Sequence, residues 1–460
     1  MLKRKITKDI ERWIRNGKTP LLIDGARQVG KTTTIREALK HENFVEFNLV
    51  ENSEFLVSLN DINNNSAEEI LALFKLHSNK ELEVGKTIIF IDEIQECKEL
   101  ITKVKFLAQE GSFRYIFSGS LLGIELKNLR SVPVGYLQTI QMYPLDFEEY
   151  LTNIGVGEET FSLLRSSFDN LKPLNNSIHN QIMKRFYQYL VVGGMPEAVQ
   201  SFVNNNDYNE VLSIHKDIIK TYKLDFTKYE VTQKNLHLKA SFENIPAELN
   251  KQNKRFIIKN LDKTVHYNRI EETFEWHSAA GVSIPVYNCT EPVSPLLLNK
   301  KSNLFKLFLN DVGLLSSMYG KATIINVVNK KTNVNFGALY ENYIAQELNS
   351  HGYKCYYYNS KKYGELDFVI ETDGVLPIEV KSGANYTKHS ALNNVMSNKS
   401  FNINKAIVFS NENVSHAEVS TLYKEKKDFK IKENYVVLYL PIYMTIFIDE
   451  SKIDLNKALL

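Results

Sequence analysis

Cysteine is scarce in this chain. Three cysteines, Cys97, Cys289 and Cys355, occur among 460 residues, and long stretches of sequence separate them. Disulfide frameworks and zinc sites need paired cysteines or short ligand spacings, which are missing here. The spacing argues against both kinds of site and predicts reduced, buried thiols in a cytoplasmic protein.

The chain also lacks an excess of either charge. Its 56 basic and 54 acidic residues give a formal net charge of +2. A protein that binds nucleic acid through its overall charge carries a large basic excess. Any nucleic-acid surface on this protein must therefore be local.

Long apolar runs are missing too. The basic opening, residues 1–18, has no apolar core of the length that a secretory signal needs. Helical spacing predicts instead a packing helix whose apolar face is made by Ile6, Ile10, Trp13 and Ile14. The most apolar late stretch, residues 435–448, is too short to span a bilayer and contains Pro441. We expect two strands there and no association with a membrane.

A phosphate-binding loop is the first motif that is present. Residues 25–32 read Gly-Ala-Arg-Gln-Val-Gly-Lys-Thr, between a predicted strand at residues 20–24 and a helix that begins near Lys31. Backbone N–H groups of such a loop can surround phosphate oxygens. Lys31 would neutralise the β- and γ-phosphates and Thr32 would ligate Mg²⁺. The predicted nucleotide-binding residues of this segment are Gly25, Ala26, Arg27, Gln28, Val29, Gly30, Lys31, Thr32 and Thr33.

A second segment supplies the acids of a nucleotide site. The apolar run at residues 88–91 predicts a buried strand that ends in Asp92 and Glu93. Asp92 would hold the metal, usually through water, and Glu93 would polarise the attacking water. Either pattern alone also arises by chance or at a strand that meets solvent, but both together predict binding of ATP or GTP. Hydrolysis requires in addition that Glu93 be correctly aimed.

The first third of the chain alternates strands and helices. Strands are expected at residues 21–24, 44–48, 87–91 and 115–118, with helices after Lys31 and at residues 67–76 and 100–109. This order predicts an α/β fold for residues 1–150, with a parallel sheet in three layers. Ser118 would end the last of these strands, where its hydroxyl can contact the γ-phosphate. Capping of the next helix is an equal alternative for Ser118.

A chain of 460 residues is too long for one core and suggests about three domains. Residues 151–230 favour a helical lid. Residues 231–325 favour a winged-helix-like module, a kind that binds duplex DNA or only joins domains. Its expected strand is residues 305–309, and its expected core is Leu236, Ile245, Leu249, Ile270, Phe274 and Trp276. A polar linker, residues 326–335, precedes the last domain at residues 336–460.

A second group of charged residues lies in that last domain. Residues 364–370 and 376–381 predict a hairpin that carries Asp367 on one arm and Glu379 and Lys381 on the other. Strict alternation would put Leu366, Phe368 and Ile370 on one face and Asp367 and Val369 on the opposite face. Two carboxylates can hold a divalent ion, and a nearby lysine can stabilise the charge that develops in phosphodiester cleavage.

Glu341 adds a third acid to this prediction. It lies on the apolar stripe of a helix expected at residues 336–348, where a carboxylate is out of place. If the stripe packs on the hairpin, Glu341 would join the metal site. The alternative is a set of ordinary surface charges: Asp367 at a strand start, Glu379 and Lys381 as an ion pair, and Glu341 at a helix rim.

Together these motifs resemble a known family, and the likeness runs nearly end to end. The family is that of prokaryotic AAA-like ATPases with a C-terminal domain of the PD-(D/E)XK nuclease fold, related to the signal-transducing NTPases. Besides the two nucleotide motifs, the matching segments are residues 118–120, 143–149, 193–198, 311–314, 340–341, 365–367 and 379–381. The resemblance implies that Glu341, Asp367, Glu379 and Lys381 fill the nuclease positions, with Glu341, Asp367 and Glu379 on the metal.

One segment departs from the family pattern. Members often have Arg after a Pro-x-Gly segment, where this chain has Tyr136. That difference puts fast turnover in doubt and leaves Arg27, Arg36 and Arg130 as candidates for a charge-stabilising arginine. ATP is favoured over GTP because a guanine-reading Asn/Thr-Lys-x-Asp segment is missing at the usual place.

Two functions therefore stay open. The first is an ATPase, with ATP and Mg²⁺ as cofactors, that controls a Mg²⁺-dependent DNA nuclease. The second is a nucleotide-dependent switch or scaffold whose last domain mediates assembly, as a homo-oligomer or with a partner protein, without catalysis.

Overall fold

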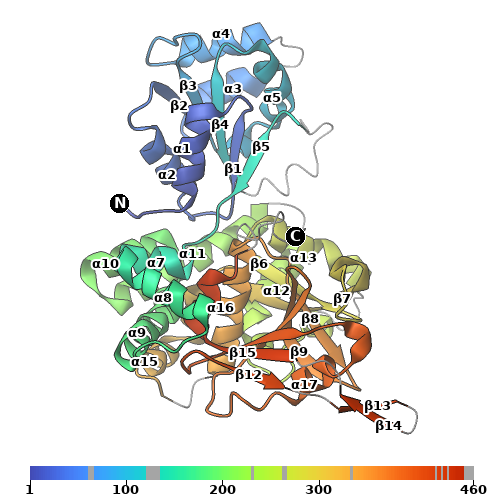
Figure 1. Ribbon diagram of the computed structural model, residues 1–460. Coiled ribbons are helices and arrows are strands. Elements are labelled where there is room, and N and C mark those ends of the chain that lie inside the picture. The colour runs from blue at the N-terminus through green and yellow to red at the C-terminus, as the bar shows by residue number, and fades with distance from the viewer. Residues whose placement is uncertain are drawn as a thin grey trace. The chain divides into compact units, whose positions relative to one another are not determined.

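The computed structural model (Figure 1) divides into two units. The N-terminal unit comprises Met1–Pro144 and Glu275–Val282, and the C-terminal unit comprises Leu145–Phe274 and Ser283–Leu460. The described residues are 1–60, 67–120, 135–228, 233–261, 267–331, 335–419, 422–425, 428–431 and 435–449.

A parallel five-stranded sheet forms the core of the N-terminal unit. The strands are β1 (Leu21–Asp24), β2 (Phe44–Asn48), β3 (Ile88–Asp92), β4 (Arg114–Gly119) and β5 (Gln138–Gln141). They pair in parallel in the order β2-β3-β4-β1-β5. All five residues of β3 are buried, as expected for a parallel strand that is covered on both faces. The predicted α/β class and parallel sheet are confirmed.

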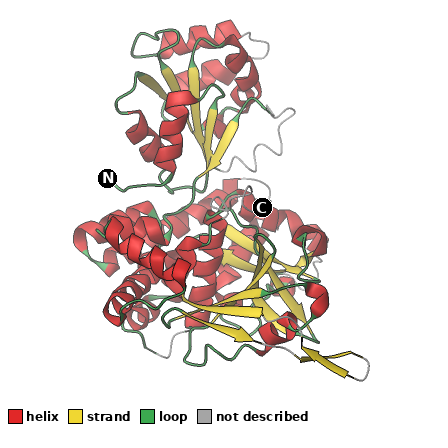
Figure 2. Cartoon of the chain, viewed as in Figure 1, coloured by secondary structure: helices red, strands yellow, loops and turns green. Residues whose placement is uncertain are grey.

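Helices cover this sheet on both sides (Figure 2). They are α1 (Ile6–Asn16), α2 (Lys31–Leu39), α3 (Ser53–Asn60), α4 (Ala67–His77), the 3₁₀ turn η1 (Ile94–Glu96) and α5 (Lys98–Glu110). Residues of α3, α4 and α5 share one buried cluster with β2, β3 and β4. On α1 the four apolar residues predicted to pack are all buried. The sequence did not lead us to expect α3 and β5.

The C-terminal unit begins with helices. They are α7 (Phe147–Asn153), α8 (Glu158–Asn170), α9 (Asn176–Val192), α10 (Pro196–Asn205), α11 (Tyr208–Lys228) and α12 (Gln233–Leu249). Residues 151–230 are thus mostly helical where they are described, but they belong to the C-terminal unit. A lid function for them remains a prediction.

An eight-stranded mixed sheet follows, in the order β12-β15-β11-β10-β9-β8-β6-β7. Its strands are β6 (Ser283–Cys289), β7 (Lys300–Leu309), β8 (Tyr356–Ser360), β9 (Gly364–Glu371), β10 (Val375–Val380), β11 (Lys405–Ser410), β12 (Ser415–Val419) and β15 (Tyr435–Pro441). A separate small sheet pairs β13 (Leu422–Glu425) with β14 (Asp428–Ile431).

The remaining elements surround this sheet. The helices are α13 (Tyr267–Ala279), α14 (Val312–Tyr319), α15 (Lys321–Val328), α16 (Phe336–Ser350) and α17 (Ser390–Met396). The 3₁₀ turns are η3 (Ile258–Asn260), η4 (Leu296–Asn299), η5 (Lys399–Phe401) and η6 (Ile442–Phe447). Within the described residues, no helix has the length and hydropathy that a bilayer-spanning segment needs.

The winged-helix-like module is not confirmed. The strands that it would need, β6 and β7, pair with each other and then with β8 of the last domain. Tyr287 of β6 faces Tyr356 of β8, so residues on both sides of the expected linker share one sheet. Leu236, expected in the core of that module, is 66% exposed, whereas the other five predicted core residues are buried.

Two local predictions in the last domain were wrong. Val369 does not share a face with Asp367, because the β8–β9 register shifts and Val369 joins Leu366 in one buried cluster. An extra residue in one strand reverses the alternation beyond it. Residues 435–448 form one strand and one 3₁₀ turn, not two strands, because the chain turns directly after Pro441.

Two glycine-containing motifs pack together inside the C-terminal unit. The N–H of Gly194 donates to Asp311 Oδ2 over 2.5 Å, and Asp311 Oδ1 accepts from the Leu314 N–H over 3.0 Å at the start of α14. A Cβ on Gly194 would lie 2.0 Å from the Leu145 carbonyl oxygen, so no other residue fits there. Burial raises the pKa of Asp311 to about 6. These motifs therefore stabilise the fold.

Candidate nucleotide site and C-terminal charged cluster

The loop between β1 and α2 has the backbone that its glycines predict. Gly30, directly before α2, has φ +92°, in the left-handed region that residues with a Cβ adopt at a cost. A Cβ on Gly25 would lie 2.2 Å from the carbonyl oxygen of Met142, so only glycine fits at that position. The loop can therefore turn tightly at the carboxyl end of β1 and start a helix there, which is the geometry of an anion site.

Lys31 is buried at the centre of this loop. Its Nζ donates to the carbonyl oxygens of Gly25 and Ala26, each over 2.9 Å, and to Ser120 Oγ over 2.8 Å. Burial lowers the pKa of Lys31 to about 8, although the acids Glu93, Asp24 and Asp92 oppose the shift. All three acceptors are neutral, so a phosphate group would supply the full countercharge that the ammonium lacks. The residues therefore fit a nucleotide phosphate.

Asp92 joins the loop to the central strands. Thr32 Oγ1 donates to Asp92 Oδ2 over 2.9 Å, and Asn48 Nδ2 donates to the same oxygen over 3.3 Å. Ser118 donates to the other carboxylate oxygen. Burial raises the pKa of Asp92, and the hydrogen bonds from Ser118 and Thr32 partly offset that shift. A magnesium ion held at Thr32 and Asp92 would restore the favourable environment for the ionised form.

The position of β4 explains the contact of Ser118. Because β4 lies between β1 and β3, its carboxyl end lies between the loop and Asp92. The hydroxyl of Ser118 is used there to orient Asp92. Its predicted contact with the γ-phosphate stays a prediction.

Glu93 adopts a left-handed backbone conformation, with φ +57°, directly after β3. Such a conformation is uncommon for a residue with a side chain and occurs often at functional positions. Gln95 donates to the Glu93 carboxylate through Nε2, and its Oε1 accepts from the Ser120 N–H over 3.2 Å. Gln95 and Ser120 therefore link Glu93 to Lys31.

Sequence reasoning missed three residues of this site: Asn48, Gln95 and Ser120. Gln95 and Ser120 each stand two positions beyond a residue that was chosen, Glu93 and Ser118. Asn48 ends β2, the strand beside β3. A polar residue at the carboxyl end of a parallel strand, or within three residues after it, was the available signal in all three cases.

The three candidate arginines differ in their positions and contacts. Arg36 forms a two-pronged ion pair with Glu46, in which Nε lies 2.8 Å from Oε2 and an Nη atom lies 2.6 Å from Oε1. Arg27 lies within the loop, and Arg130 lies outside the described residues. Tyr136, which stands at the position of the family arginine, accepts a hydrogen bond from Gln109 over 3.2 Å.

The other predicted loop residues differ in exposure. Thr33 is exposed and Val29 is buried.

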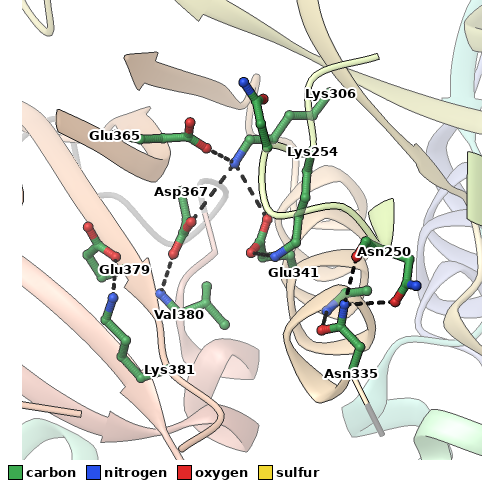
Figure 3. Close-up of polar contacts among 12 residues, drawn as sticks. Asn250, Lys254, Lys306, Asn335, Glu341, Glu365, Asp367, Glu379, Val380 and Lys381 are labelled. Carbon is green, nitrogen blue, oxygen red and sulfur yellow. Dashed lines mark hydrogen bonds and ion pairs between the residues drawn. The ribbon is translucent and has the colours of Figure 1, made fainter. Parts of the chain in front are cut away.

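The second charged group surrounds Lys306, a residue of β7 that the sequence did not point to (Figure 3). Its Nζ lies 2.8 Å from Glu365, 3.5 Å from Glu341 and 3.9 Å from Asp367. Lys254, from the segment after α12, forms an ion pair with Glu341. The stripe of α16 therefore does meet the hairpin, but lysines lie between the acids. We name these five residues, Lys254, Lys306, Glu341, Glu365 and Asp367, the lysine–acid cluster.

The pKa values follow from these contacts. Burial alone would lower the pKa of Lys306, but Glu341, Asp367 and Glu365 outweigh it and hold the pKa above its usual value. Burial raises the pKa of Glu341 in spite of Lys306 and Lys254. Burial also acts to raise the pKa of Asp367, but the same lysines, with the Val380 N–H, hold it below the usual value.

Glu379 and Lys381 form a separate pair beside the cluster. Their carboxylate and ammonium lie 3.1 Å apart, and Glu379 is almost completely buried. Asp367 Oδ2 accepts from the Val380 N–H over 2.9 Å, which ties the two arms of the hairpin together. A pocket of about 470 Å³ is lined in part by Asp367, Glu379 and Lys381. Burial, together with the nearby Asp367, raises the pKa of Glu379 well above its usual value.

These residues do not fit a divalent ion as they stand. Across the described part of the chain, no group of three or more His, Cys, Asp or Glu side chains is arranged to hold a metal. Each of the four acids Glu341, Glu365, Asp367 and Glu379 lies within 4 Å of at least one of three lysines, Lys254, Lys306 and Lys381. The metal roles inferred for Glu341, Asp367 and Glu379 remain predictions.

A parallel sheet, a glycine-containing loop before a helix, and an acid that contacts the loop threonine define the N-terminal unit as a P-loop nucleotide-binding domain. Comparison with protein families agrees, because residues 17–151 match an AAA domain. The chain carries an AAA-type P-loop ATPase domain. Residues 183–324 and 336–443 match two domains of unknown function, DUF8612 and DUF4143.

Solved structures give distant matches. The Walker-type ATPase PABY2304 of Pyrococcus abyssi is 15% identical, covering 69% of this chain and 96% of its own, with a TM-score of 0.42. Cdc6p of Pyrobaculum aerophilum is 13% identical, covering 71% and 95%, with a TM-score of 0.26. The Aeropyrum pernix Orc1 protein, solved with DNA, is 12% identical, covering 71% and 91%, with a TM-score of 0.29. No curated protein matches the sequence.

Proposed function

We propose that this protein binds ATP with Mg²⁺, hydrolyses it, and uses the nucleotide state as a switch for its C-terminal unit. The contact of Thr32 with Asp92, over 2.9 Å, carries the first part of the proposal. It brings a hydroxyl and a carboxylate, the two ligands that a P-loop site uses to hold magnesium, beside Lys31. Glu93, one position further, is the residue that we propose as the base for the attacking water.

The experiment for this part compares ATP hydrolysis by the wild-type chain, Lys31→Ala and Lys40→Ala. Lys40 is an exposed lysine just beyond α2, so its loss removes a similar charge without touching the loop. We expect Mg²⁺-dependent hydrolysis by wild type and Lys40→Ala and none by Lys31→Ala. Equal turnover by all three proteins would contradict the assignment of the loop.

The switch is supported by the course of the chain near the loop. Residues 275–282 belong to the N-terminal unit, and a Cβ on Gly281 would lie 3.2 Å from the backbone nitrogen of Ala26. The next residue after this segment, Ser283, is the first of β6. A change in the loop on nucleotide binding can therefore be transmitted through Gly281 to β6 of the eight-stranded sheet.

We propose further that the C-terminal unit is a non-catalytic binding or assembly module. The lysines of the lysine–acid cluster support this part, because their ammonium groups lie among the acids with which a nuclease would hold its metal. The partner can be a second copy of this chain, another protein or DNA. Sedimentation of the chain with and without a non-hydrolysable ATP analogue tests the first of these, and nucleotide-independent sedimentation would count against assembly as the output.

DNA cleavage with Mg²⁺ is the second candidate function. One observation favours it: Asp367, Glu379 and Lys381 line one pocket at the end of the hairpin, and Glu341 of α16 shares the Lys306 ammonium with Asp367. The test is incubation of DNA with the protein, Mg²⁺ and ATP, beside Lys381→Ala. Cleavage by the wild-type protein that is lost in Lys381→Ala would establish the nuclease and refute the non-catalytic proposal.

A further inference from the structure

The lysine–acid cluster joins two parts of the chain that match different domains of unknown function. Its acids, Glu341, Glu365 and Asp367, lie within residues 336–443, and its lysines lie within residues 183–324. Lys306 reaches the acids because β6 and β7 extend the sheet of the last domain. One segment therefore supplies the cations for the acidic group of the other.

Hydrogen bonds from α16 to Leu309 and Val312 fix the position of the strand that carries Lys306. On α16, Asn342 bonds both backbone groups of Leu309: its Oδ1 accepts from the N–H over 2.8 Å and its Nδ2 donates to the carbonyl over 3.1 Å. Further along α16, Gln346 accepts from the Val312 N–H over 2.9 Å. These bonds set the end of β7 against α16, and thereby set Lys306 against Glu341.

The ammonium is also well enclosed. Lys306 is 1% exposed, and its Nζ lies 5.2 Å from the centre of the Tyr357 ring, within the range of a cation–π contact. Three carboxylates within 4 Å compensate for the loss of hydration. Lys254 contacts Glu341 of α16, and the start of the same helix is bonded to a nearby residue, because Asn335 Nδ2 donates to the backbone and side chain of Asn250 (Figure 3).

We propose that Lys306 is the resident cation of this acidic group: its ammonium takes the place of a divalent ion and keeps metals out. The cluster is then a latent metal site that is closed by a residue of the DUF8612-matching segment. This inference deepens the proposal that the C-terminal unit is non-catalytic and rests on it. It does not depend on whether the N-terminal unit hydrolyses ATP.

The experiment is a titration of the nucleotide-free full-length chain with Mn²⁺, followed by electron paramagnetic resonance of the free ion. Lys306→Met removes the charge and retains a long apolar side chain, and Lys301→Met makes the same change at an exposed position of β7. We expect Lys306→Met to gain one Mn²⁺ site at least about tenfold tighter than any site in wild type or Lys301→Met. The double variant Lys306→Met/Asp367→Asn should lose that gain.

Two results would overturn the proposal. One is an Mn²⁺ site in the wild-type chain that Asp367→Asn abolishes, a measurement that does not require Lys306→Met to fold. The other is a folded Lys306→Met with no gained site, because the acids would then form no cation site at all. The proposal that the C-terminal unit is non-catalytic would fail in a different experiment. DNA cleavage by the wild-type protein would contradict it, and the metal titration does not measure cleavage.

Discussion

Thr32 and Asp92 are separated by 60 positions, and the hydroxyl of Thr32 donates a hydrogen bond to Asp92 Oδ2 over 2.9 Å. Parallel pairing brings this about, because the carboxyl ends of β1 and β3 lie at the same edge of the sheet with only β4 between them. Ser118, at the end of β4, bonds the other oxygen of Asp92. The carboxylate is thus oriented before any ligand arrives.

Asp92→Ala should weaken ATP binding only where Mg²⁺ is present. The variant removes the carboxylate that accepts hydrogen bonds from Thr32 and Ser118 and that would hold the metal. We expect the increase in ATP affinity that Mg²⁺ causes to be reduced by about tenfold or more. Calorimetric titration with an ATP analogue, in Mg²⁺ and in EDTA, measures the two parts. Asp9→Ala, an exposed acid of α1, is the control. Identical metal dependence in wild type and Asp92→Ala would show that Mg²⁺ is held elsewhere.

The affinity for ATP should fall as pH rises through about 8, the pKa of Lys31. The phosphate favours the protonated lysine, so binding above this pH must take up a proton. The same shift affects the stability of the fold. In the unfolded chain Lys31 has a pKa of 10.5 and keeps its proton to higher pH. The free-energy cost of burying the charged lysine on folding is therefore complete below pH 8 and disappears between pH 8 and 10.5. Affinities of wild type and Lys31→Arg across this range provide the check. Arginine stays protonated throughout this range, so Lys31→Arg should lose the pH dependence. If Lys31→Arg retained the wild-type pH dependence of the affinity, a group other than Lys31 would be responsible for it.

Glu93→Gln should bind ATP normally and hydrolyse it slowly. Glutamine keeps the shape and a hydrogen bond to Gln95 but cannot accept the proton of water, which costs roughly 10²- to 10⁴-fold in rate. Phosphate release under saturating ATP gives the rate, and Glu96→Gln, an exposed acid of η1, is the matched control. Turnover at the wild-type rate would eliminate Glu93 as the base.

Gly281→Ala should weaken ATP binding although Gly281 lies outside the loop sequence. Its φ is +68°, and the new Cβ would lie 3.2 Å from the nitrogen of Ala26. Gly85→Ala is a close control, because Gly85 has φ +76° and open space around it. Both variants should lose roughly 1–2 kcal/mol of stability from backbone strain. Only Gly281→Ala should lower the affinity for ATP, and equal affinities would argue against transmission through this contact.

Lys306→Ala should be among the most destabilising single substitutions in the C-terminal unit. Removing one member of a buried ion group leaves Glu365 without its cation and Glu341 with Lys254 alone, which costs about 3–5 kcal/mol. Lys301→Ala, on the same strand but exposed, should cost less than about 0.5 kcal/mol. Urea denaturation of both variants measures the difference. If Lys306→Ala were as stable as Lys301→Ala, the contacts of Lys306 would contribute little to folding.

The sequence alone predicted that Thr32 and Asp92 lie together, because the signals for the loop and for the acidic strand end are local. A loop of eight residues and a strand that ends in two acids are properties of short segments, and a parallel sheet then brings them to one edge. The same logic would have reached Asn48, Gln95 and Ser120 if polar residues at the strand ends, and just after them, had been given equal weight. It could not show that Ser118 bonds Asp92, because that contact depends on which strand lies between β1 and β3.

In the last domain the sequence predicted the hairpin with its acids Asp367 and Glu379, and left open whether Glu341 meets that hairpin or lies at a helix rim. Only the tertiary structure placed Lys306 and Lys254 among them, because that contact depends on β6 pairing with β8, a pairing between residues on opposite sides of the expected linker. The shift in the β8–β9 register was equally hidden, since an inserted residue leaves the composition of a strand unchanged. Spacing along the chain determines which groups can meet across the turn of the hairpin. The lysines that neutralise its buried acids come from distant segments, and the pairing of β6 with β8 in one sheet decides that contact for Lys306.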